Sequence, residues 1–94
     1  MKMIKARLYT EHKNRDAIEL SVAQHFSAFT IFDAAGYWKG VRENSVCIEV
    51  IAPYERCIMR DIFTLIAENI NRENDQECCM FTLEEVETFT VYSR

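Results

Sequence analysis

The stretch SVCIEVIAPYERCIMRDIFTLIAENI, residues 45–70, decides the fold, because two hydrophobic periods follow each other within it. Over residues 45–52 valines and isoleucines alternate with other side chains, as in a half-buried strand. After Pro53, apolar residues recur every three to four positions, as on one face of a helix. Proline is well suited to the first turn of a helix, where its missing N–H costs no hydrogen bond. The stretch therefore predicts a strand followed directly by a helix that begins at Pro53 and runs to about residue 71.

The sequence on either side of residues 45–70 shows the same two hydrophobic periods, and these predict the remaining helix and strands. Asn14 is a favourable N-cap for a first helix, and Asn74 is a plausible left-handed stop after the second. The predicted elements are a strand over residues 3–10, a helix from Asn14 to Phe26, a strand over 29–35, the strand 45–52, the helix 53–71 and a strand over 76–82. Residues 83–94 are a continuation of the last strand or a fifth edge strand.

This order, βαββαβ, is that of an α+β ferredoxin-like sandwich with a four-stranded antiparallel sheet. Two helices cover only one face of such a sheet. The expected core is Ile4, Leu8, Ile18, Val22, Phe26, Ile48, Val50, Ile62, Phe63 and Ile66. The other face would carry Tyr9, Cys47, Ile51 and one side of the segment 78–80. Because that face is too apolar to remain wet, we expect self-association.

Composition limits the classes of function. The 94 residues make a single domain, residues 1–94. Eleven Lys and Arg against fifteen Asp and Glu give a net charge of −4, which disfavours a general nucleic-acid binder. No apolar run approaches the about 18 residues of a membrane span, and the first residues lack a signal-peptide core. We expect a cytoplasmic protein with neither a nucleic-acid nor a membrane partner.

The four cysteines are Cys47, Cys57, Cys78 and Cys79. They form no C-x-x-C motif, so the sequence predicts neither a zinc site nor a disulfide framework. No phosphate-binding loop or other cofactor motif is present either. We therefore expect no metal and no cofactor.

Residues 36–43 form the most unusual cluster, because they bring both glycines together with the single tryptophan. The glycines predict the turn or bulge of a long hairpin. Tyr37 and Trp38 can stack on a planar base or face a cation, and Glu43 can pair with a cationic group. The same aromatic residues can instead pack on the domain or on a neighbouring subunit, and composition alone favours that interpretation.

Three segments resemble two known families: residues 29–40 (FTIFDAAGYWKG), 43–51 (ENSVCIEVI) and 75–78 (DQEC). One is a bacterial and phage domain family of unknown function with a similar F-T-x-x-x-A-x-G-x-W segment. The other is the phage-encoded S-adenosylmethionine (SAM) lyases, also called SAM hydrolases. Their pattern includes a Gly-x-Tyr before the hairpin, a Glu that opens the next strand, and an acidic-Gln-acidic-Cys segment.

The second resemblance implies a PII-like form of the ferredoxin-like fold and a trimer with active sites between subunits. It also implies a phage-encoded anti-restriction enzyme that acts in the host cytoplasm and converts SAM to methylthioadenosine and homoserine lactone. The implied catalytic residues are Glu43 and Tyr37, and the implied substrate-binding residues are Trp38, Gly36 and Gln76. Glu43 would bind the ammonium or sulfonium side of the substrate, and Tyr37 would orient its methionine moiety. Trp38 would line the adenosine pocket or face the sulfonium.

One departure concerns the tyrosine. Tyr37 directly follows Gly36, where the family has a spacer. Trp38 is therefore the alternative occupant of the tyrosine's place.

Two further classes of function use the same residues. One is a non-catalytic PII-like trimer that binds a nucleotide-like metabolite in the same cleft, as a sensor or sponge. The other is a structural or interaction module in which the hairpin only builds the trimer. Recovery of unchanged ligand would favour the sensor, whereas dissociation of the oligomer by Trp38→Ala would favour the module.

Overall fold

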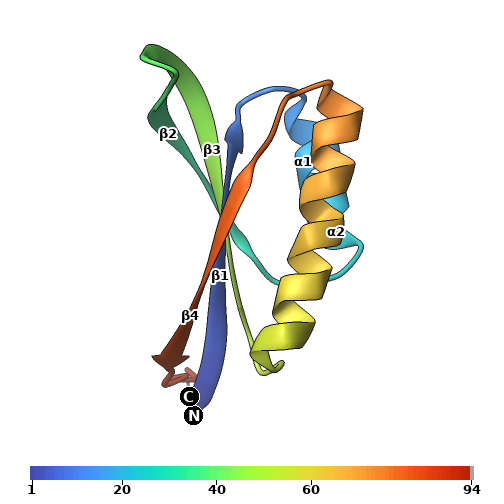
Figure 1. Cartoon of the computed structure of the whole chain (residues 1–94). Helices are drawn as coiled ribbons and strands as arrows, with labels where there is room; N and C mark the ends of the chain where they lie inside the picture. Colours follow the sequence, from blue (N-terminus) through green and yellow to red (C-terminus); the bar gives the residue numbers. More distant parts are fainter. Residues whose placement is uncertain (94) are drawn as a thin grey trace.

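The elements of the chain follow the predicted βαββαβ order, in a computed structural model that describes residues 1–93. They are β1 (Lys2–Glu11), α1 (Arg15–Ala23), β2 (Thr30–Trp38), β3 (Val41–Ala52), α2 (Arg56–Asn74) and β4 (Met80–Glu87). The four strands form one antiparallel sheet in the order β2-β3-β1-β4. Both helices cover the same face of this sheet (Figure 1). The ferredoxin-like α+β architecture is thus confirmed. None of the helices within residues 1–93 is long and apolar enough to cross a membrane.

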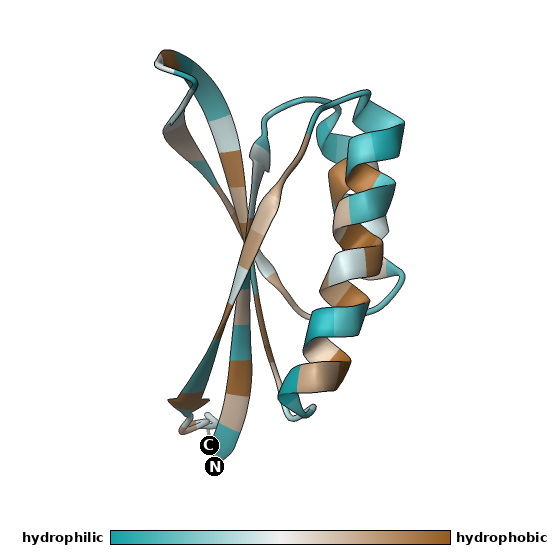
Figure 2. Ribbon diagram, viewed as in Figure 1, coloured by the Kyte–Doolittle hydropathy of each residue, from teal (hydrophilic) through white to brown (hydrophobic). Residues whose placement is uncertain are grey.

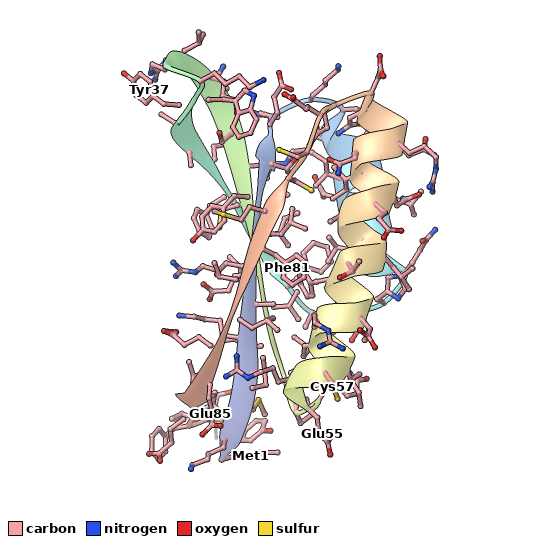
Figure 3. The ribbon with its side chains drawn as sticks, viewed as in Figure 1. Met1, Tyr37, Glu55, Cys57, Phe81 and Glu85 are labelled. Atoms are coloured by element: carbon pink, nitrogen blue, oxygen red, sulfur yellow. The ribbon has the colours of Figure 1, made fainter. Side chains whose placement is uncertain are left out.

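The core lies between the sheet and the two helices. Apolar and polar segments alternate along β1 and α2 (Figure 2), as their periods predict. Nine of the ten expected core residues are buried, and Ile62 is only partly buried against the others. Phe63 of α2 is fully buried, and its ring centroid lies 5.7 Å from those of both Phe26 and Phe81. This aromatic contact joins the segment that follows α1, helix α2 and β4. Figure 3 shows Phe81 between the sheet and α2.

Strands β2 and β3 form a longer hairpin with a tighter turn than expected. Pairing continues to Trp38 opposite Val41, so the turn contains only Lys39 and Gly40. Both turn residues have positive φ, 50° and 79°, as in the two-residue turns whose twist matches paired strands. Gly36 is therefore a strand residue in an unbroken register, and the expectation that it supplies turn or bulge geometry was wrong. The long hairpin projects beyond the helices (Figure 1) and helps to give the molecule a length of 44 Å.

The ends of the first helix differ from their sequence prediction. Asn14 occupies the N-cap position but makes no side-chain capping bond. It adopts a left-handed backbone with φ 54°, and its carbonyl oxygen instead accepts bonds from the N–H groups of Ala17 and Ile18. Helix α1 ends at Ala23 rather than Phe26, although the Phe26 N–H still donates to the carbonyl of Val22 at 3.0 Å.

The ends of the second helix were also predicted wrongly. Pro53 lies in the connection before α2, because the helix begins at Arg56 with Glu55 as its N-cap residue. Asp75, rather than Asn74, takes the left-handed conformation at the C-terminal end, with φ 49°. Asn74 is buried as the last helical residue, and its Nδ2 donates to the carbonyl of Lys13 at 2.7 Å. A tertiary hydrogen bond thus holds Asn74 within the helix and leaves the left-handed position to its neighbour.

The last strand begins and ends later than residues 76–82. Residues 76–79 form the connection from α2, and β4 pairs with β1 from Met80 to Glu87. Residues 83–94 were predicted either to continue the last strand or to form a fifth strand. Residues 83–87 continue the fourth strand. Residues 88–93 have no strand structure, and the N–H of Thr88 donates to the carbonyl of Met1 at 2.8 Å. Arg94 lies outside the described residues.

The face of the sheet that no helix covers carries one apolar row. Phe32, Cys47, Tyr9 and Met80 lie opposite one another across all four strands. The next row contains Arg7 and Glu49, whose side chains form a 2.7 Å ion pair. Cys47 is fully buried by its neighbours, whereas the three large side chains of the apolar row remain partly exposed. This face therefore combines an apolar band with paired charges.

Candidate functional site

A groove of about 750 Å³ lies between the β2–β3 hairpin and the connection that joins α2 to β4. The end of β1 forms its floor, the hairpin forms one wall, and residues 75–80 form the other. All five residues singled out by sequence line this groove: Gly36, Tyr37, Trp38, Glu43 and Gln76. Segments that are distant in the sequence, within residues 9–11, 34–45 and 75–80, thus meet at one concave surface.

Small side chains make the hollow on the hairpin side. Gly36, Ala34 and Ser45 line the groove from neighbouring rungs of the hairpin. A Cβ atom at Gly36 would lie only 2.7 Å from the Ser45 Oγ. A larger residue at Gly36 would therefore require the Ser45 hydroxyl to move, which gives this glycine a role that does not depend on a turn.

We predict that Gly36→Ala alters the groove and weakens ligand binding, because the new methyl group must displace the Ser45 hydroxyl. The double variant Gly36→Ala/Ser45→Ala should recover much of the loss, since the nearest remaining atom, the Ser45 Cβ, is 3.7 Å from the added group. Thermal unfolding and ligand affinity of both variants check this. Equal defects in the single and double variants would contradict it.

Glu43 and Tyr37 lie on adjacent rungs of the hairpin. Glu43 pairs with Gly36 and Tyr37 pairs with Arg42, so the two side chains leave the hairpin on opposite faces. Glu43 is half-buried, and its carboxylate has no ion-pair partner among residues 1–93. Tyr37 is 73% exposed near the tip of the hairpin (Figure 3). Both line the groove, but one chain does not enclose them together.

Gln76 fixes the opposite wall of the groove through its amide nitrogen. Its Nε2 donates to the Thr10 Oγ1 at 2.7 Å, and to the Asn71 Oδ1 and the Cys78 carbonyl at 3.3 Å each. Its Oε1 is buried and has no hydrogen-bond partner within the described part of the chain. A buried acceptor without a donor costs free energy, which the three contacts of the amide nitrogen offset as they hold this wall in place.

Glu77 is a groove residue that the sequence did not single out for a role. Its Oε2 accepts a hydrogen bond from the Trp38 Nε1 at 3.3 Å, and its Oε1 accepts one from the Lys39 Nζ at 3.2 Å. These contacts link the hairpin tip to the connection before β4 across 38 and 39 positions of sequence. The only sequence signal was its place in the segment 75–78, because no local pattern reveals so distant a contact.

The Cys79 thiol in the groove is a poor nucleophile. Burial raises the pKa of Cys79 to about 11, so this thiol is neutral at physiological pH. Its Sγ lies 3.7 Å from the Ala67 carbonyl, on the helix side of the sheet. Among residues 1–93, no three His, Cys, Asp or Glu side chains converge as metal ligands would. The groove therefore offers carboxylates, aromatic rings and amide groups, which suit the binding and orientation of a cationic molecule.

Known proteins resemble this chain in fold, at low sequence identity. The sequence matches no protein-family model and no curated protein. A phage SAM lyase in its apo state superimposes with a TM-score of 0.75 and 17% identity over 89% of this chain and 81% of that one. A phage SAM lyase in complex with S-methyl-5'-thioadenosine gives a TM-score of 0.65 and 13% identity over 88% and 81% of the two chains.

Two further structures share the fold. A DUF3240 family protein from Shewanella baltica has a TM-score of 0.74 and 13% identity, with 97% of each chain covered. CPII, a nitrogen regulatory PII-like protein from Thiomonas intermedia bound to ADP, AMP and bicarbonate, has a TM-score of 0.62 and 11% identity over 98% of each chain. This chain therefore has the PII-like form of the ferredoxin-like fold.

Proposed function

We propose that this protein is a SAM lyase, which converts SAM to methylthioadenosine and homoserine lactone. The observation that carries the proposal is that all five site residues from the sequence line one groove. The fold supports it, because a phage SAM lyase in complex with S-methyl-5'-thioadenosine is among the similar structures. That nucleoside is the product of the proposed reaction.

The reaction needs no protein nucleophile. A carboxylate oxygen of the substrate attacks its own γ-carbon, the bond from that carbon to sulfur breaks, and the electron pair stays on sulfur. No water is consumed and no proton is transferred. A protein accelerates such a step by holding the bent conformer with the reacting atoms aligned, away from water. A groove of carboxylate, aromatic and amide groups supplies these contacts.

Each groove residue has a place in this scheme. Glu43, without an ion-pair partner in the described chain, binds the α-ammonium of the substrate and so directs the neighbouring carboxylate toward the γ-carbon. Tyr37 orients the methionine moiety. Trp38 contacts the sulfonium next to the adenosine, and Gln76 shapes the wall of the groove against which the ligand lies. Gly36 gives the ligand room against the hairpin.

The complete site includes a neighbouring subunit. In one chain Tyr37 is 73% exposed and Trp38 is 45% exposed, so neither encloses a ligand. The apolar row that contains Tyr9 and Met80 is continuous with the groove, since both of these residues also line it. A second copy on this face would bury the row and close the groove. We expect a homo-oligomer, a trimer, with one site at each interface.

Incubation of the purified protein with SAM, followed by chromatography with mass detection, tests the proposal. Formation of methylthioadenosine and homoserine lactone above the spontaneous rate of the same buffer without protein is the expected result. Unchanged SAM that co-elutes with the protein would instead indicate a non-catalytic binder. Neither turnover nor binding would contradict both functions.

A further inference from the structure

The Lys39 side chain of the hairpin turn contacts Trp38 and Glu77, two residues that line the groove. The Lys39 Nζ lies 3.2 Å from the Glu77 Oε1 and 5.7 Å from the centroid of the Trp38 ring. The Trp38 Nε1 donates to the second oxygen of the same carboxylate at 3.3 Å. A carboxylate and the face of an indole ring together form a favourable environment for a positive charge.

The Trp38 ring and the Glu77 carboxylate come from different parts of the chain, the hairpin and the connection before β4. Lys39 belongs to the hairpin turn itself. Lys39 is the first residue of the two-residue turn and has φ 50°. Its side chain is 68% exposed, and that of Glu77 is 63% exposed. Ion pairs at this exposure are weak, so a competing cation can displace the lysine at little cost.

We propose that Trp38 and Glu77 form a binding site for a ligand sulfonium, and that Lys39 occupies this site until the ligand arrives. Lys39 is thereby a specificity-determining residue, because it weakens the binding of a charged ligand and leaves that of an uncharged nucleoside unchanged. The identification of the charged ligand as SAM rests on the function proposed above. The cation site itself rests only on the contacts among these three side chains.

This arrangement has a consequence for the end of the reaction. The bond cleavage turns the sulfonium into an uncharged thioether, which the carboxylate of Glu77 no longer attracts. Lys39 can then return to Glu77 and satisfy its charge. Methylthioadenosine therefore departs without leaving an unpaired carboxylate at the mouth of the groove.

The emission of Trp38 gives a direct test, because it is the only tryptophan of the chain. Trimethylsulfonium chloride replaces sodium chloride stepwise at constant ionic strength, so that general salt effects stay fixed. The wild type is compared with Lys39→Met, which removes the charge, and with Lys39→Arg, which keeps it. The double variant Lys39→Met/Glu77→Gln serves as the control that lacks the carboxylate.

We expect a saturable change in emission whose midpoint is about three- to fivefold lower in Lys39→Met than in the wild type and in Lys39→Arg. The double variant should show only the linear quenching of random collisions. Equal midpoints in the wild type and Lys39→Met, or no saturable change in either, would overturn the proposal. The same variants titrated with SAM and methylthioadenosine should show tighter binding in Lys39→Met for SAM alone.

Failure of this proposal and failure of the lyase function are distinguishable. A lower trimethylsulfonium midpoint in Lys39→Met, in a protein that forms no methylthioadenosine, would support the cation site and reject the lyase. Turnover of SAM with equal midpoints in all lysine variants would support the lyase and reject the role of Lys39.

Discussion

Replacement of Glu43 by Gln is expected to lower kcat/KM for SAM by about 100-fold, because the substrate ammonium loses a charge-assisted contact at a half-buried position. Glutamine keeps the size of the side chain and its acceptor oxygen, so the loss reports the charge. The Glu43 carboxylate has no ion-pair partner among the described residues, and its removal should therefore leave stability nearly unchanged. The rate of methylthioadenosine formation measures the effect.

Glu68→Gln is the matched control for this variant. Glu68 is an exposed residue of α2 outside the groove, and its substitution changes the net charge equally. We expect wild-type turnover from this control. Turnover of Glu43→Gln within about twofold of the control would remove Glu43 from the mechanism.

Replacement of Phe63 by Ala is expected to lower the free energy of unfolding by about 3–5 kcal/mol. The side chain is fully buried, and it contacts Phe26 and Phe81 with ring centroids 5.7 Å away in each case. Its truncation leaves a cavity where α2, β4 and the segment that follows α1 meet. Because small domains are stable by only about 5–15 kcal/mol, the variant should be close to unfolding.

Urea denaturation followed by circular dichroism measures this loss. Leu65→Ala on the same helix is the control, because Leu65 is 57% exposed and its truncation opens no cavity. We expect a change below about 1 kcal/mol for the control. A loss at Phe63 no larger than that at Leu65 would contradict the assigned core.

The order of elements and the core could be predicted because both depend on local periodicity. Alternation around Ile48 and the three-to-four spacing around Ile66 identify the buried faces without knowledge of the partner elements. The ends of elements depend instead on contacts between distant residues. Asn74 remains helical because its amide reaches Lys13, and β4 begins at Met80 because the register with β1 reaches that residue.

In the candidate site, too, local features could be predicted from the sequence and contacts between distant residues could not. Residues 36–43 could be found from composition, because they contain the single tryptophan and both glycines. Glu77 could not be assigned a role from sequence, because its contacts with Trp38 and Lys39 arise only when the hairpin bends toward the connection before β4. Likewise, only the register reveals that Tyr37 and Glu43 leave the hairpin on opposite faces. The roles of the site residues and the trimer remain predictions.

The central claim is that the substrate's own carboxylate performs the displacement while the protein only positions it. A reaction with SAM in water labelled with oxygen-18, sampled at early times, tests this claim most directly. The account predicts methylthioadenosine together with homoserine lactone that carries no label. Homoserine labelled in its hydroxyl group would show that water attacks the γ-carbon, and would contradict the account, as would the absence of methylthioadenosine above the spontaneous background.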